Sequence, residues 1–345
     1  MGTTYDVTVG IPVYNVEHYV RKCLLSVLDQ TFDGNLEILV VNDCSTDGTM
    51  EIIRELQETH PRGQQIYCYN QSENLGIGVS RNLIIEKAKG KYLLFVDSDD
   101  YITPDCIQKL YTEAENHQAE VVYGSVKTIN TNVELSYLSQ PYQVFNKTDE
   151  LASYAFQNLH ENLRNYIWNT LFLVSFLKKQ QLEFPKCRFH EDVIFSTDMV
   201  PLVTKAILLP DVTYYYVIRD NSLSNLQGRT NINLQEIMEF IEIYTYVKNK
   251  NKSLKGKPYY EARCARSMTQ MLYIVSGLIK NRRIITPALT NGMIKDAMKH
   301  PASFMEIMAF KKYKMANLAF YMLGIMPGWL TVTIITIIAK YKHLI

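Results

Sequence analysis

The first 125 residues alternate between short apolar runs and longer segments with helical periodicity, and this alternation limits the fold more than any other feature. Apolar runs typical of buried strands span residues 5–12, 36–42, 66–70, 92–96 and 121–123. Helical patterns fill the intervals, and the first begins near Val20 with Asn15 before it as a candidate N-cap. Strand and helix in regular alternation predict an α/β fold with a mostly parallel, doubly wound sheet and helices on both faces.

Polar residues follow each of the first four predicted strands at the point where the strand ends. These segments are IPVYN at 11–15, NDCSTDG at 42–48, NLG at 74–76 and DSDD at 97–100. The carboxyl ends of parallel strands meet at one edge of a sheet, and α/β proteins bind their ligands at that edge. The sequence therefore predicts one site built from these loops.

Composition narrows the class of protein. With 345 residues, of which 47% are hydrophobic, the chain can form one large domain or two. Its 36 Lys and Arg residues nearly balance its 35 Asp and Glu residues, which argues against a nucleic-acid partner. Six scattered cysteines without Cys-x-x-Cys spacing, and no secretion signal at the N-terminus, predict a cytoplasmic protein.

Three carboxylates, Asp97, Asp99 and Asp100, follow the apolar run YLLFV. Like charges this close repel one another unless a cation lies between them. Mg²⁺ and Mn²⁺ suit such a site, because they bind one or two carboxylates and complete their coordination with water and phosphates. The alternative is a solvated acidic turn in which Asp100 caps the next helix.

Other charged residues are candidates for a role in binding or catalysis. Arg81, near the start of a predicted helix, can hold a phosphate or brace the acidic loop, or can be an ordinary surface arginine. Glu191 and Asp192 head another predicted helix, where acids serve either as a general base or as favourable charges at the helix N-terminus. His190 beside them can share this work or simply pack.

Five segments taken in order resemble the family 2 glycosyltransferases, which have a GT-A fold. These are IPVYN at 11–15, VNDCSTDGT at 41–49, NLG at 74–76 with Arg81-Asn82, FVDSDD at 95–100 and HED at 190–192. The resemblance covers residues 5–225 and implies inverting transfer of a sugar from a nucleotide donor to a hydroxyl group. It also implies a divalent metal cofactor, Mn²⁺ or Mg²⁺.

The resemblance assigns roles to individual residues. The donor site that it implies comprises Pro12, Tyr14, Asn15, Asp43, Asn74, Arg81, Asp97, Ser98, Arg219 and Ser222. By the same resemblance Asp99 binds the metal, Asp192 is the catalytic base, and Glu191 reaches acceptor or sugar hydroxyls. The acceptor candidates are Trp168, which can equally be core, and His190. Many relatives have a lysine after Trp-Asn, whereas Thr170 follows Trp168-Asn169 here.

The C-terminal third lies outside the resemblance and is predicted to be helical. We expect a catalytic domain at 1–228, a helical extension at 229–304 and an apolar helical hairpin at 305–345. No charged residue occurs from Met315 to Ala339, but Pro327-Gly328 favours two short helices over one membrane span. This tail can pack on the catalytic domain, form a homodimer surface, lie on a membrane or cross it. Residues 248–257, KNKNKSLKGK, are predicted as a solvated loop.

The resemblance to family 2 glycosyltransferases implies a hexosyl- or N-acetylhexosaminyltransferase that uses a UDP-sugar. The expected acceptor is a glycan, in particular a lipid-linked intermediate of surface polysaccharide synthesis. The protein would then be peripheral at the inner face of the cell membrane, held there by its tail. Two alternatives stay open, namely transfer to polyprenyl phosphate and a non-catalytic protein that binds sugar nucleotides or glycans.

Overall fold

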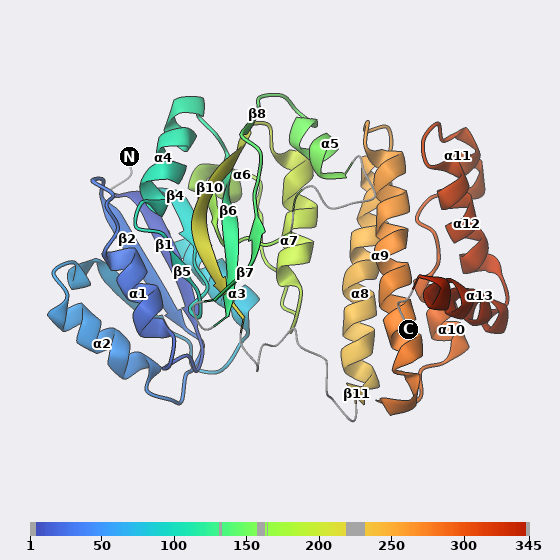
Figure 1. The fold of residues 1–345 in the computed structure, drawn as a ribbon, viewed down its shortest axis with the longest axis horizontal. Helices are drawn as coiled ribbons and strands as arrows, with labels where there is room; N and C mark the ends of the chain where they lie inside the picture. The colour runs from blue at the N-terminus through green and yellow to red at the C-terminus, as the bar shows by residue number, and fades with distance from the viewer. Residues whose placement is uncertain (1–4, 131–132, 157–162, 164, 219–231, 343–345) are drawn as a thin grey trace. The chain divides into compact units, whose positions relative to one another are not determined.

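The computed structural model describes residues 5–130, 133–156, 163, 165–218 and 232–342. The chain divides into two compact units, Met1–Leu151 with Asn165–Leu223 and Ala152–Arg164 with Ser224–Ile345 (Figure 1). The elements before residue 150 are β1 (Tyr5–Val13), α1 (Val20–Leu28), β2 (Leu36–Asn42), α2 (Thr49–Thr59), η1 (Gly63–Gln65), β3 (Ile66–Asn70), α3 (Ile77–Lys87), β4 (Gly90–Phe95), β5 (Tyr101–Ile102), α4 (Cys106–His117), β6 (Val121–Asn130), β7 (Val133–Leu138) and β8 (Gln143–Phe145). Those that follow are α5 (Glu150–Phe156), β9 (Thr170–Leu173), α6 (Val174–Lys179), α7 (Glu191–Met199), η2 (Val200–Leu202), β10 (Ala206–Val217), β11 (Ile232–Asn233), α8 (Leu234–Lys250), η3 (Asn251–Leu254), α9 (Tyr260–Lys280), η4 (Arg282–Ile284), β12 (Ile285–Thr286), α10 (Asn291–Ala297), α11 (Phe304–Ala309), α12 (Lys314–Ile325) and α13 (Gly328–Tyr341).

One sheet organises the first unit, with its main strands in the order β3-β2-β1-β4-β9-β6-β10-β5. The first four of these pair in parallel, which confirms the predicted doubly wound arrangement for this half. Beyond β4 the sheet is mixed, because β9 runs antiparallel to both β4 and β6. The carboxyl ends of β1 to β4 therefore meet at one edge, as the positions of the polar loops require.

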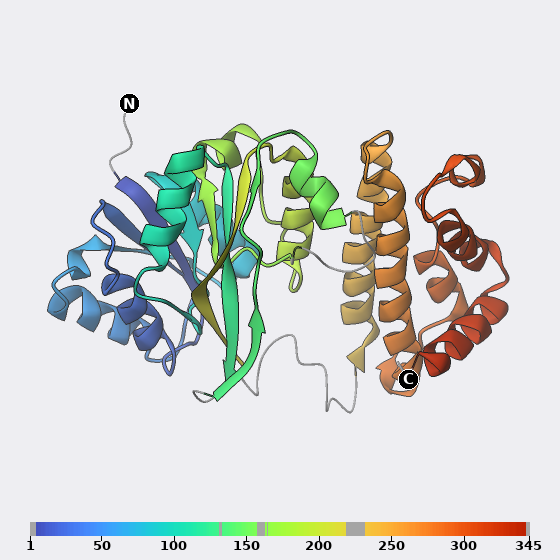
Figure 2. The same ribbon diagram turned by 45° about the horizontal axis from the view of Figure 1, so that its top comes forward.

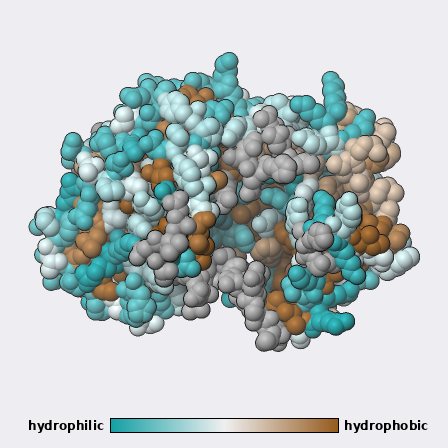
Figure 3. Space-filling model, in the orientation of Figure 1, coloured by the Kyte–Doolittle hydropathy of each residue, from teal (hydrophilic) through white to brown (hydrophobic). Residues whose placement is uncertain are grey.

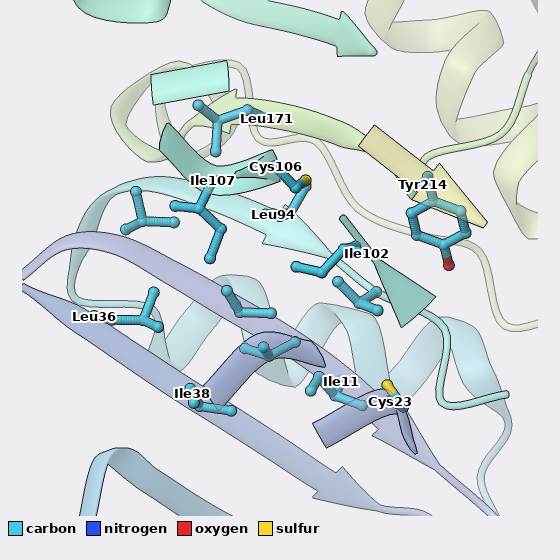
Figure 4. Close-up of a cluster of buried hydrophobic side chains, with 14 of the residues drawn as sticks. Ile11, Cys23, Leu36, Ile38, Leu94, Ile102, Cys106, Ile107, Leu171 and Tyr214 are labelled. Carbon is cyan, nitrogen blue, oxygen red and sulfur yellow. The ribbon is translucent and has the colours of Figure 1, made fainter. Parts of the chain in front are cut away.

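The strands are held by a core of aliphatic side chains that continues from one strand to the next. Every residue of β2 is buried, as expected for a strand covered on both faces. Figure 4 shows side chains of β1, β2, β4 and β9 together with those of helices α1 and α4. Burying one such side chain contributes about 1.5–3 kcal/mol, so this core gives the loops at the strand ends a rigid base.

The second unit is mainly helical. Helices α8 and α9 lie side by side in both ribbon views (Figures 1 and 2) and share a core with α10, α12 and α13. The two short helices predicted around Pro327-Gly328 are present, since α12 ends at Ile325 and α13 begins at Gly328. Within the part of the chain that the structure describes, no helix combines the length and the apolar character needed to cross a membrane.

The prediction of a solvated loop at residues 248–257 is wrong at its start, whereas Lys252, Ser253, Lys255 and Gly256 are exposed as predicted. Helix α8 continues through Lys250, and the side chain of Lys248 is only 2% exposed. Its Nζ atom donates a hydrogen bond to the carbonyl oxygen of Ala297 at 2.6 Å. Asn251 is also buried and donates to Ser267 Oγ at 2.9 Å. Buried polar partners, which the local charge pattern does not reveal, bring Lys248 and Asn251 into the core.

Candidate active site

The loops after β1 and β2 are joined through Asn15. Its side-chain oxygen accepts a hydrogen bond from the backbone N–H of Thr46 at 2.8 Å, and its own N–H donates to Ser45 Oγ at 3.1 Å. Asn15 has a positive φ of 49°, and α1 begins only at Val20, so the prediction that Asn15 caps this helix is wrong. The residue instead fixes two loops of the site to each other.

Asp43 connects this pair of loops to the loop after β3. Its two carboxylate oxygens accept hydrogen bonds from the backbone N–H groups of Leu75, at 2.7 Å, and Gly76, at 2.9 Å. Gly76 has a φ of 93°, a conformation that favours glycine. A carboxylate has about four lone-pair sites, so Asp43 keeps capacity to accept from a ligand. Asn74 is exposed beside this contact.

Two further predicted donor-site residues flank these loops. Pro12 is buried within β1, while the ring of Tyr14 is half exposed just beyond the end of the strand. Tyr14 thus offers an aromatic surface at the edge where the loops meet.

The acidic loop after β4 holds its three carboxylates in different environments. Asp100 is buried and accepts hydrogen bonds from Tyr214 Oη and from the backbone N–H of Val217, both at 2.8 Å. Burial raises the pKa of Asp100 well above its ordinary value, and the negative charges of Asp99 and Asp97 raise it further. Asp99 stays partly exposed, and Ser98 is buried. The loop therefore presents the partly exposed carboxyl groups of Asp97 and Asp99 at the edge of the sheet, while Asp100 is held inside.

Arg81 on α3 joins the acidic loop to α7. Its side chain is 3% exposed, and its Nη2 atom donates to Asp97 Oδ1 at 2.7 Å. Its Nη1 atom forms a second ion pair with Glu191 Oε1. Burial alone lowers the pKa of an arginine, but Asp97 and Glu191 together raise that of Arg81, so it stays charged. The sequence left open whether Arg81 lies on the surface, and the structure shows that it does not.

Asp192 lies beside this ion-pair network in the first turn of α7. It is half buried, and its Oδ1 atom accepts a hydrogen bond from the backbone N–H of Val193 at 2.8 Å. Burial, and next the charge of Glu191, raise the pKa of Asp192 to about 7, although Arg81 opposes this shift. A carboxyl group with this pKa can accept a proton near neutral pH, as a general base must.

Two residues that the sequence analysis did not assign to the site hold the segment before α7 in place. Asn82 donates from Nδ2 to the carbonyl oxygen of Phe184 at 2.8 Å and accepts from the N–H of Phe184 at 2.7 Å. At Gly78, a Cβ atom would lie 2.6 Å from the carbonyl oxygen of Pro185, so only glycine permits this close approach. The signal was present in the sequence, because Asn82 follows Arg81 directly and Gly78 precedes it on the same helix.

Tyr214 is a third residue that the sequence analysis missed. Besides donating to Asp100, its hydroxyl group accepts a hydrogen bond from the backbone N–H of Asp97 at 3.1 Å. The run of aromatic residues at 214–216 is typical of a strand, but nothing in the local sequence identifies which ring reaches the acidic loop.

The two acceptor candidates lie in different surroundings. Trp168 is half buried and stacks on Tyr166, Tyr214 and Tyr216, with ring centroids 4.1, 4.6 and 5.5 Å away. His190 precedes α7 with a φ of 57°, and burial lowers its pKa. Thr170, which stands where many relatives have lysine, is fully buried in β9. Arg219 and Ser222 lie outside the described residues.

The acidic loop has carboxylates of the kind that bind a divalent cation. Asp97 is paired with Arg81 and Asp100 with Tyr214, and both Asp97 and Asp99 are partly exposed. No group of three or more His, Cys, Asp or Glu side chains in the described residues could hold a metal ion by itself. This arrangement fits Mg²⁺ or Mn²⁺ bound through one protein carboxylate and completed by phosphates and water, as is common for Mg²⁺.

Comparison with known proteins identifies a matching family model and related sequences. Residues 8–179 match the model of glycosyl transferase family 2. Glycosyltransferase GlyA of Streptococcus pneumoniae serotype 4 is 35% identical over 229 residues, covering 64% of this chain and 32% of its own length. The Staphylococcus aureus poly(ribitol-phosphate) beta-N-acetylglucosaminyltransferase TarS is 26% identical over 215 residues, covering 61% of this chain and 35% of its own length. The chain thus spans only about a third of each of these curated relatives.

Solved structures of two transferases are similar in fold to this chain. The crystal structure of TarS residues 1–349 in complex with UDP aligns with a TM-score of 0.58 and 17% identity, covering 92% of this chain and 90% of that one. The mannosyltransferase PcManGT from Pyrobaculum calidifontis, in complex with GDP-Man and Mn²⁺, aligns with a TM-score of 0.52 and 18% identity, covering 99% and 87%. These likenesses confirm the predicted GT-A type of fold.

Proposed function

Because this chain belongs to glycosyl transferase family 2 through residues 8–179, we propose that it is an inverting glycosyltransferase that acts on a hydroxyl acceptor. The family supports transfer of a sugar from a nucleotide-sugar donor to a glycan. The observation that carries the finer proposal is Asp192, whose pKa of about 7 suits a base at neutral pH. It lies next to Glu191, which Arg81 ties to the acidic loop.

The proposed reaction is a single displacement at the anomeric carbon. The acceptor oxygen forms a bond to the anomeric carbon of the donor sugar while the bond from that carbon to the diphosphate breaks. Asp192 takes the proton of the acceptor hydroxyl, which typically accelerates such a step by about 10²- to 10⁴-fold. The electron pair of the broken bond leaves with the nucleoside diphosphate, and a single displacement of this kind inverts the anomeric centre.

Asp99 is the residue that would hold the divalent cation, Mg²⁺ or Mn²⁺. When bound, such a cation supplies Lewis-acid stabilisation of the charge that develops on the departing diphosphate. Arg81 neutralises Asp97, and Tyr214 holds Asp100. These contacts hold the other two carboxyl groups of the loop in fixed positions.

For the donor we propose a UDP-sugar, with a hexosyl or N-acetylhexosaminyl group. TarS has been solved with UDP and PcManGT with GDP-Man, so both nucleotides occur among proteins of this fold. The half-exposed ring of Tyr14 and the remaining acceptor capacity of Asp43 suit a nucleobase at this edge. Asn15, Asn74 and Ser98 lie on the same loops, and Arg219 with Ser222 remain donor-site candidates from the sequence.

For the acceptor we propose a glycan hydroxyl, carried in the cell by a lipid-linked intermediate of surface polysaccharide synthesis. The half-buried Trp168 stack gives an aromatic surface of the kind that sugars pack on. An acceptor of this kind would place the enzyme at the inner face of the cell membrane.

Acceptors of different chemistry test this proposal. The wild-type chain and Asp192→Asn would be incubated with a UDP-sugar panel and Mn²⁺, with either a glycan or polyprenyl phosphate as acceptor. We expect transfer to the glycan only, reduced about 10²- to 10⁴-fold by Asp192→Asn. Transfer to polyprenyl phosphate with only a mild effect of the substitution would favour a phosphate acceptor, which needs no strong base. Donor binding without transfer to either would indicate a non-catalytic binding protein.

A further inference from the structure

Helices α12 and α13 turn large apolar side chains outward. On α12 the exposed residues include Met315, Met322 and Ile325, whose spacing of seven and three places them on one helix face. On α13 they are Trp329, which is 63% exposed, and Ile337, which is 62% exposed. Figure 3 shows apolar residues gathered over these C-terminal helices.

The opposite faces of the same helices are also apolar. Leu323 of α12 and Ile335 of α13 belong to the core that these helices share with α8, α9 and α10. A surface helix of a water-soluble unit normally has one apolar face and one polar face. Since both faces are apolar here, the outer face is suited to a second apolar environment rather than to water.

Lysines border this apolar stretch on both sides. From Lys311 to Ile345 the sequence contains five lysines and no Asp or Glu. Lys311 and Lys312 precede α12 and are exposed, as are Lys340 and Lys342 at the end of α13. Within the described ranges none of these four lysines has an ion-pair partner. The sequence of these helices is therefore positively charged, although the whole chain has a net charge of only +1. The carboxylate of Glu261 is bound here and accepts hydrogen bonds from the backbone N–H groups of Lys311 and Lys312.

The lengths of the helices decide how they can meet a membrane. With 12 and 14 residues, α12 and α13 are about 18 and 21 Å long, shorter than the hydrocarbon core of about 30 Å. Helices of this length with apolar and aromatic residues on the outside and lysines at the ends can lie in the interface between headgroups and acyl chains. Trp329 is the residue type that favours this depth.

We propose that the outer faces of α12 and α13 dock on an anionic membrane surface, with Met315, Met322, Ile325, Trp329 and Ile337 inserted among the lipids. A second copy of the chain is the competing occupant. In a two-fold symmetric dimer the same surface meets itself, which would bring positive flanks together, whereas anionic headgroups attract them. The docking involves no catalytic residue and is independent of whether sugar transfer occurs.

Vesicle co-sedimentation of the full chain, without donor or metal, tests the proposal. The probes are vesicles of phosphatidylcholine alone and of phosphatidylcholine with about one third phosphatidylglycerol, at about 0.1 M and 0.5 M salt. We expect binding to the anionic vesicles at low salt and much weaker binding at high salt or to phosphatidylcholine alone. Equal binding to both kinds of vesicle, or to neither, would overturn the proposal.

Two double variants separate the apolar and the charge contributions. Trp329→Ser with Ile337→Ser should weaken vesicle binding about 10-fold or more, since each loses a side chain buried in lipid. Lys340→Gln with Lys342→Gln should weaken it about 30-fold at low salt, since each lysine near an anionic surface contributes about a factor of five. All four residues are exposed, so we expect both variants to keep the thermal unfolding temperature of the wild type.

Matched controls use exposed residues of the first unit. Leu135→Ser with Leu202→Ser removes two exposed apolar side chains, and Lys179→Gln with Lys186→Gln removes two exposed lysines. Neither should change vesicle binding, and an equal loss in these controls would contradict a specific docking face. Sedimentation velocity without vesicles tests the competing occupant. A dimer that the Trp329→Ser and Ile337→Ser substitutions convert to a monomer would assign the face to a second copy and overturn the proposal.

Discussion

Arg81 and Glu191, 110 residues apart in the sequence, form a buried ion pair that joins α3 to the first turn of α7. The same guanidinium group binds Asp97 in the loop after β4 at 2.7 Å. One cation therefore connects the acidic loop, where the donor diphosphate is expected, to the helix that carries the proposed base. Guanidinium suits this position because it binds two carboxylates in fixed directions and stays charged when buried.

We expect Arg81→Met to destabilise the chain by about 3–5 kcal/mol, because it leaves buried carboxylates without their cation. Arg21→Met is the matched control, since Arg21 pairs with Glu55 on the exposed surface, where solvent screens the pair, and should change stability little. Urea unfolding measures both variants. Similar losses in the two would show that the buried pair contributes no more than a surface pair.

Gly78→Ala should destabilise the chain by about 1–3 kcal/mol, as expected for overpacking. The added Cβ atom would lie 2.6 Å from the carbonyl oxygen of Pro185 and would displace the segment that leads into α7. Donor turnover should fall as well. Gly277→Ala is the control. The Cβ atom added at this position of α9 would have no neighbour within 4 Å outside its own helix backbone, so the substitution should stabilise the chain by about 0.5–1 kcal/mol. Unchanged stability and turnover in Gly78→Ala would contradict the close approach.

The raised pKa of Asp192 determines the pH dependence that we expect for sugar transfer. Because its pKa is raised to about 7, the fraction of deprotonated base increases through this pH, and kcat/KM should rise between about pH 6 and 8. Stability should change in the opposite direction. A carboxyl group with a raised pKa binds more protons in the folded state, so its contribution is largest below its ordinary value of 3.8 and is lost as the pH rises through about 7.

Asp192→Asn provides the control for both curves. It should remove the rise in kcat/KM and flatten this part of the stability profile, measured as unfolding temperature against pH. A profile that keeps its rise near pH 7 at reduced amplitude in Asp192→Asn would assign that titration to another group.

Lys248, in the second unit, should give the opposite dependence of stability on pH. Burial, and next the charges of Lys252 and Lys299, lower its pKa from 10.5 to about 8. Between these two values the unfolded chain binds a proton that the folded chain has released, so this residue makes stability rise as the pH increases from about 8 to 10. In Lys248→Met the rise should be smaller, as followed by urea unfolding across this range. Identical slopes in the two proteins would show that Lys248 titrates at its ordinary value.

The parallel half of the sheet could be predicted because each of its strands and helices has its own local pattern. The position of β9 could not, because it pairs with Tyr92 through Leu173 and with Val121 through Phe172, partners that no local pattern identifies. The C-terminal turn at Pro327-Gly328 was predictable for the same local reason as β1 to β4, since proline and glycine act within a few residues.

The sequence indicates which residues form the candidate site, but it indicates less well what each of them does there. The sequence shows that three acids follow β4, but Tyr214 and Val217, more than 100 residues away, determine that Asp100 is held by β10. The pairing of Arg81 with Glu191 likewise depends on tertiary structure. Asn15 illustrates the converse, because a local pattern suggested a helix cap and a contact with Thr46 gave it another role.

Nucleotide release from a panel of sugar nucleotides tests the central claim most directly. It would be measured with Mn²⁺, with Mg²⁺ and with a chelator, comparing the wild type with Asp99→Ala and with the exposed Asp33→Ala as control. The account predicts that one donor, a UDP-sugar, is turned over only with a divalent metal, and that Asp99→Ala abolishes this turnover while Asp33→Ala does not. Turnover that persists in the chelator or in Asp99→Ala would contradict the assignment of the acidic loop to a metal-bound diphosphate.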